Sequence, residues 1–236
     1  MSREDRISAT QTAFEILDVI YERRGATAAD LIEATGRSRS GVYKHLRTLV
    51  AVDALVNRDG EYVLGPKFTE YGLEATDSNS VLYQTDKIDE LAQSYDAPTN
   101  LWLNETDRCH CVHTSLGEGR EYPRSRGDSE RLVESPPGKA ILAHLPSARQ
   151  TAHIGGEDAE LTAQLETVQE GKLLEEPLPF APEWVSIATP VLDPSDRPVA
   201  AIEVVVPIDR ANGIDIKNNI SGLLTETANR MRVEML

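Results

Sequence analysis

Residues 36–65 read GRSRSGVYKHLRTLVAVDALVNRDGEYVLG, and this stretch predicts the fold of the N-terminal part of the chain. Between residues 34 and 52 the chain carries four cations and no anion, although its formal net charge is −15. Such a basic segment in an acidic protein favours a partner that is more acidic still, and a phosphate backbone has that property.

The apolar residues of this stretch recur at helical spacing. Ser38 suits the N-cap of a helix, and Val42, Leu46 and Leu49 would form its buried face. A shorter helix precedes it, opened by capping-box spacing at residues 27–30 and ended near Gly36. A short helix, a tight turn and a second helix with small polar and basic residues at its start predict a helix-turn-helix.

A β-hairpin should follow the second helix as a wing. Asp59-Gly60 lies between two short runs of β-forming residues, which is a typical hairpin signal. We expect phosphate contacts from Arg37, Arg47 and Arg58, with Arg58 at the tip of the wing. Base-edge contacts should come from residues on the exposed side of the helix: Ser38, Arg39, Ser40, Tyr43 and Lys44. The competing interpretation is an exposed polar face on a small helical domain.

Composition indicates a folded, soluble, two-domain protein. The chain has 236 residues, of which 40% are hydrophobic, and no apolar run approaches membrane-spanning length. Its N-terminus does not resemble a signal peptide, so a cytoplasmic location is expected. Residues 1–65 carry net −1 and residues 66–236 net −14, and only six residues of the chain are lysine. This acid-rich, lysine-poor composition favours a halophilic protein over an ordinary acidic one.

From about residue 96 onward, strand-like segments alternate with turns and helices. This pattern predicts an α+β domain with one antiparallel sheet. The chain contains no phosphate-binding loop, zinc-binding helix, nucleophile elbow or dinucleotide fingerprint. We therefore expect no enzyme activity, no cofactor and no catalytic metal.

One cluster of reactive residue types, residues 109–113, needs an explanation. On a regular strand Cys109, Cys111 and His113 would share one face, with neighbours about 6.6–6.8 Å apart at Cα. That separation is the long limit for a disulfide. The simpler interpretation is that these are buried core residues, and the alternative is a redox- or metal-responsive switch.

Six segments of the chain together resemble the IclR family of transcriptional regulators. They are FEILDVI (14–20), SRSGVYKHLRTL (38–49), DGEYVLGPK (59–67), SPPGKAILAHLP (135–146), SIATPVLD (186–193) and PVAAIEVVVP (198–207). The resemblance implies a winged helix-turn-helix domain (residues 1–66), linker helices (67–95) and a GAF-like effector-binding domain (96–236). It also implies homodimers, often paired into homotetramers, that bind double-stranded promoter operators and respond to a small metabolite.

The resemblance also implies a set of effector-binding positions. In this chain they are Pro136, Pro137, Gly138, Glu175 or Glu176, Ser186, Glu203 and Val205. Glu203 stands where the family often has Ser, and three roles for it are open: a pocket residue, a member of a structural ion pair, or an exposed residue. If it is buried, it needs a partner, for which the candidates are Arg120, Arg124, Arg126 and Arg131.

Two departures from the family pattern fall in the recognition helix. Gly41 replaces Thr or a similar residue, which favours close backbone approach to DNA at some loss of helix propensity. Lys44 replaces Arg, so the charge remains but the bidentate geometry is lost.

Overall fold

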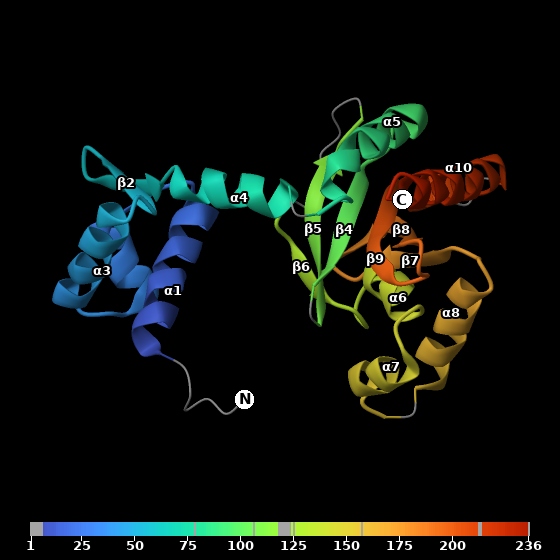
Figure 1. Ribbon diagram of the computed structural model, residues 1–236, viewed down its shortest axis with the longest axis horizontal. Coiled ribbons are helices and arrows are strands. Elements are labelled where there is room, and N and C mark those ends of the chain that lie inside the picture. The colour runs from blue at the N-terminus through green and yellow to red at the C-terminus, as the bar shows by residue number, and fades with distance from the viewer. Residues whose placement is uncertain are drawn as a thin grey trace. The chain divides into compact units, whose positions relative to one another are not determined.

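The structure is a computed structural model that describes residues 7–77, 79–105, 107–117, 124, 126–156, 158–211 and 214–235. The chain divides into two compact units, Met1–Ser78 and Asn79–Leu236, which are shown in Figure 1. The two helices expected to link the domains fall on opposite sides of this division. Helix α4 (Lys67–Asp77) belongs to the first unit, and helix α5 (Thr85–Tyr95) belongs to the second.

The first unit contains the expected helix-turn-helix and wing. Its elements in chain order are α1 (Ser8–Arg23), β1 (Ala26–Thr27), α2 (Ala28–Thr35), α3 (Arg39–Ala51), β2 (Leu55–Arg58), β3 (Glu61–Leu64) and α4. The three strands form an antiparallel sheet in the order β1-β3-β2.

Side chains from α1, α2, α3 and β2 bury a common core in this unit. Ile16, Ile20, Leu31, Leu46 and Leu55 are all at most 1% exposed. Removal of this much apolar surface from water is the main force that fixes α3 against α1 and α2.

The second unit is built on a six-stranded antiparallel sheet in the order β6-β5-β4-β9-β8-β7. Its strands are β4 (Thr99–Glu105), β5 (Arg108–Ser115), β6 (Ser129–Arg131), β7 (Leu174–Leu178), β8 (Ala181–Leu192) and β9 (Pro198–Pro207). Its helical segments are η2 (Leu82–Gln84), α5, α6 (Pro136–Leu142), α7 (Ser147–Ile154), α8 (Ala159–Gln169), α9 (Ile208–Ala211) and α10 (Ile214–Val233). The expected α+β fold with an antiparallel sheet is confirmed.

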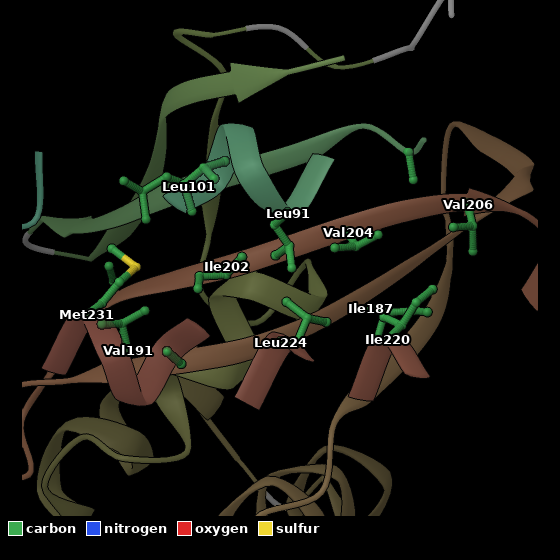
Figure 2. Packing of buried hydrophobic residues seen from close by; sticks show 14 of the residues in the cluster. Leu91, Leu101, Ile187, Val191, Ile202, Val204, Val206, Ile220, Leu224 and Met231 are labelled. Atoms are coloured by element: carbon green, nitrogen blue, oxygen red, sulfur yellow. The ribbon is translucent and has the colours of Figure 1, made fainter. Parts of the chain in front are cut away.

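Helices cover both faces of this sheet. Figure 2 shows one face, where Leu101, Ile202 and Val204 of the sheet pack against Leu91 of α5 and Leu224 of α10. The opposite face carries α6 and α8, whose apolar residues pack on the side chains that alternate with the first set. We name these the α5/α10 face and the α6/α8 face.

Four elements of the second unit were not anticipated from the sequence, and one of them is the four-residue helix α9. Strands β6 and β7 are polar edge strands, and α7 has no buried residue, so none of them shows the apolar pattern on which prediction depends. None of the helices within the described ranges is long and apolar enough to cross a bilayer.

Candidate DNA-binding and effector sites

The start of α3 is fixed by its own cap. The Oγ atom of Ser38 accepts a hydrogen bond from the backbone N–H of Gly41 at 3.2 Å, which confirms Ser38 as the N-cap. A Cβ atom at position 41 would lie 3.1 Å from that Oγ atom, which is a tight contact. Gly41 therefore has a local packing reason beside the expected close approach to DNA.

The exposed face of α3 carries the residues expected to contact DNA. Arg39, Ser40, Tyr43, Lys44 and Arg47 are all exposed, whereas Val42, Leu46 and Leu49 are buried as predicted. The guanidinium carbon of Arg39 lies 5.7 Å from the centre of the Tyr43 ring. This cation–π contact holds the Arg39 and Tyr43 side chains next to each other on the exposed face of α3.

Arg37, in the turn before α3, is held by an acidic partner. Its Nη2 atom lies 2.9 Å from Oε2 of Glu15 on α1, and both side chains are about half exposed. A phosphate contact by Arg37 must therefore compete with Glu15.

The wing turns at Asp59 and Gly60, which both have positive φ, at 53° and 96°. Two consecutive residues of positive φ are what a type I′ hairpin turn requires, and Asp-Gly supplies them at low cost. Arg58 is the last residue of β2 and stands opposite Glu61, next to the turn. Arg58 is exposed, but it lies beside the turn and not at the tip of the wing, where it was expected.

In the second unit, the Glu203 carboxylate lies on the α6/α8 face and is fully buried. Its Oε2 atom accepts hydrogen bonds from Nδ2 of Asn100 at 3.0 Å and from Nε1 of Trp102 at 2.8 Å. Its Oε1 atom accepts one from Oγ of Ser186 at 2.5 Å. Of the three roles left open for Glu203, that of an exposed residue is therefore wrong.

Arg124 supplies the counter-charge that burial of Glu203 requires. Its Nε atom lies 3.6 Å from Oε1 of Glu203, and its Nη1 atom donates to Oε1 of Glu130 at 2.6 Å. Its guanidinium carbon lies 4.9 Å from the Trp102 ring centre and 5.3 Å from that of Phe180.

Two of the other three candidate arginines, Arg126 and Arg131, lie in exposed surroundings. Arg126 is exposed, and Arg131 forms an exposed ion pair with Glu134 at 3.5 Å. Arg120 lies outside the described residues.

The remaining expected effector residues lie on two elements. Pro136, Pro137 and Gly138 are buried at the start of α6, where a Cβ atom on Gly138 would lie 2.7 Å from the Leu132 carbonyl oxygen. On the sheet, Ser186 stands opposite Glu176 of β7 and Val205 of β9.

The two acidic positions of β7 have different surroundings. Glu176 forms an ion pair with Lys139 of α6 at 2.6 Å. Glu175 is exposed, so strand alternation excludes it from the group that Ser186 and Glu203 form.

The expectation that Cys109, Cys111 and His113 share a face is wrong. The register shifts between Leu101 and Trp102, because Leu101 stands opposite His113 while Trp102 stands opposite Cys111. The extra residue on β5 is a β-bulge, which breaks the two-residue alternation. His113 thus pairs with Asp89 of α5 at 2.9 Å.

The cysteines lie on the other side, in the α6/α8 core, as free thiols. Burial raises the pKa of Cys109 to about 12 and that of Cys111 to about 11, so both thiols stay protonated near neutral pH. Among the described side chains, no group of three or more His, Cys, Asp or Glu could hold a metal ion. The redox or metal switch therefore has no support here.

Comparisons with known proteins match this arrangement. Residues 9–59 match the family model described as the IclR helix-turn-helix domain. The probable HTH-type transcriptional regulator ArcR of Halobacterium salinarum is 28% identical over 98% of this chain and 94% of its own length.

Solved structures share the fold over nearly the whole chain. The IclR protein of Thermotoga maritima is 19% identical, covers 98% of this chain and 99% of its own, and has a TM-score of 0.78. An IclR homologue from Microbacterium hydrocarbonoxydans, complexed with 4-hydroxybenzoate, is 17% identical, covers 96% and 98%, and has a TM-score of 0.79. Residues 9–59 thus match the IclR helix-turn-helix domain, and over nearly its whole length the chain is similar to a probable HTH-type transcriptional regulator.

Proposed function

We propose that this regulator binds specific operator DNA through α3 and the wing, and that a small molecule bound in the second unit controls it. The observation that carries the DNA-binding half is the exposed face of α3, which presents cations and hydrogen-bonding groups on an otherwise acidic chain. Arg39 and Lys44 suit base edges in the major groove, and Arg47 and Arg58 suit phosphates.

Two copies of α3 are needed for tight binding. One helix with few cations releases few counterions from the DNA, so its electrostatic contribution to affinity is small. That contribution decreases further at high salt. A homodimer would place two recognition helices on half-sites roughly 34–36 Å apart. Footprints of that spacing on selected DNA would support this arrangement.

The effector half of the proposal has two supports. One is the 4-hydroxybenzoate complex of the homologue with the same fold. The other is the α6/α8 face, where Ser186 and Glu203 meet in a buried polar group beside an apolar core. Small-molecule sites combine a mainly apolar lining with a few convergent polar groups, and this face supplies both kinds of residue.

The test begins with selection of binding sites from a pool of random double-stranded DNA. We expect one recurring motif, bound at least about 10³-fold more tightly than scrambled DNA. The selected operator then serves as the probe for candidate metabolites, each scored by the change in operator affinity that it causes. Equal affinity for selected and scrambled DNA would contradict the DNA-binding half. An operator affinity unmoved by metabolites of every tested chemical class would contradict the effector half.

A further inference from the structure

The buried carboxylate of Glu203 is bound by the chain as a ligand would be. Four side chains hold it, and we call Asn100, Trp102, Ser186 and Arg124 the carboxylate-binding set. Each oxygen has at least two of these partners: Oε2 accepts from the amide and the indole, while Oε1 accepts from the hydroxyl and faces the guanidinium.

The chemistry of the set selects a carboxylate. The amide Nδ2, the indole Nε1 and the guanidinium can only donate, and an ionised carboxyl group can only accept. The O–H···O distance of 2.5 Å to Ser186 is in the range of a charge-assisted hydrogen bond. The set therefore matches an anion with two oxygens better than any neutral group.

The sheet fixes the positions of three of the four members of the set. Asn100 and Trp102 lie on β4 and Ser186 on β8, the two strands that flank Glu203 of β9. Apolar side chains of the α6/α8 core pack around Trp102. These donors would thus keep their places if the Glu203 side chain were removed.

We propose that Glu203 is a built-in occupant of a carboxylate site, so that the unmodified protein does not bind free carboxylic acids at this set. Removal of the side chain beyond Cβ opens the site to a small carboxylate. The consequence for regulation rests on the proposed function: the effector of this protein carries no carboxylate directed at the set, and is a neutral or cationic polar molecule.

The test uses Glu203→Ala and acetate, because this substitution removes a CH₂–COO⁻ group and acetate restores nearly the same atoms. The full-length variant is melted in potassium chloride and in potassium acetate at equal potassium concentration. Acetate at ten times its dissociation constant should raise the melting temperature by about 3–6 °C for a domain of this size. Acetamide, which has the same shape but no charge, should raise it far less.

Three matched proteins control for general effects of acetate. Unmodified protein and Glu203→Gln both keep the site filled, so acetate and chloride should give them the same melting temperature. Glu175→Ala removes an exposed carboxylate from β7, an edge strand of the same sheet, and should also be indifferent to acetate.

Two results would overturn the proposal: an acetate response in the unmodified protein as large as in Glu203→Ala, or no difference between acetate and acetamide in that variant.

If Glu203→Ala does not fold in chloride, its refolding in acetate becomes the test. Recovery of native circular dichroism in acetate but not in acetamide supports the proposal, and recovery in neither contradicts it. No DNA is present, so failure here is separate from failure of the proposed regulatory function.

Discussion

The ion pair between Arg37 and Glu15 gives a prediction about DNA affinity. These residues are 22 positions apart in sequence and meet at 2.9 Å on the surface of the first unit. If Arg37 binds a phosphate, it must leave Glu15, which also repels that phosphate. Glu15→Gln removes the competing charge and keeps the size of the side chain, so operator affinity should rise.

The size of the gain follows from the exposure of the pair. The two side chains are 45% and 48% exposed, and ion pairs this open contribute about 0.2–1 kcal/mol. Because 1.4 kcal/mol corresponds to a tenfold change in affinity, Glu15→Gln should tighten binding by about 1.4- to 5-fold for each copy of the chain bound to the DNA. The gain should be equal on operator and scrambled DNA, since phosphate contacts carry no sequence information.

Fluorescence anisotropy with labelled DNA at several salt concentrations measures the effect. The design is a double-mutant cycle of Glu15→Gln and Arg37→Ala, with Glu22→Gln as the control that removes the same charge from the same helix. Arg37→Ala alone should make the plot of log affinity against log salt less steep, by about 0.9 for each copy of the chain bound to the DNA. In the Arg37→Ala background, Glu15→Gln should give no more gain than Glu22→Gln gives. If Glu15→Gln tightens binding as much in the Arg37→Ala protein as in the unmodified protein, the gain comes from net charge alone. That result would refute the coupling between Glu15 and Arg37.

Four further outcomes are expected. Ser38→Ala should destabilise the first unit by about 1 kcal/mol in urea unfolding, because the cap of α3 is lost; an unchanged midpoint would contradict the capping role. Arg39→Ala should relax sequence preference, whereas Arg47→Ala should weaken operator and random DNA alike; competition binding separates the two, and equal losses for Arg39→Ala would reject base readout. Cys109 and Cys111 should resist Ellman's reagent at pH 8 until the protein unfolds, since burial raises the pKa of both thiols; rapid labelling of the folded protein would exclude their burial. Molar salt should raise the melting temperature of the intact chain, and a lower melting temperature in salt would speak against halophilic adaptation.

Local signals in the sequence were sufficient to predict the helix-turn-helix and the hairpin of the first unit. The cap at Ser38, the apolar spacing of Val42, Leu46 and Leu49, and the Asp-Gly turn each depend on residues a few positions apart. Contacts between residues that are far apart in the chain could not be predicted from the sequence. The ion pair of Glu15 and Arg37 is an example, since no local sequence pattern predicts a contact between residues 22 positions apart.

The second unit shows the same limit more clearly. Of four arginines considered for Glu203, burial against the Trp102 and Phe180 rings singles out Arg124 among those that the structure describes. The error at His113 has a different cause. The bulge arises because the pairing of β5 with β4 shifts by one residue between Leu101 and Trp102. The sequence of β5 alone does not show how the strand pairs.

The middle pair of the sheet has a consequence for synthesis on the ribosome. Strand β4 pairs with β9, so Thr99 stands opposite Val204, about 100 residues later. The sheet thus cannot close until nearly the whole chain has emerged, and contacts of such long separation also form slowly. The first unit is complete after 78 residues, and its most distant strand pairing joins Ala26 and Tyr62, 36 positions apart. At roughly 5–20 residues per second, the folded first unit would wait about 8–30 s before the sheet of the second unit can close.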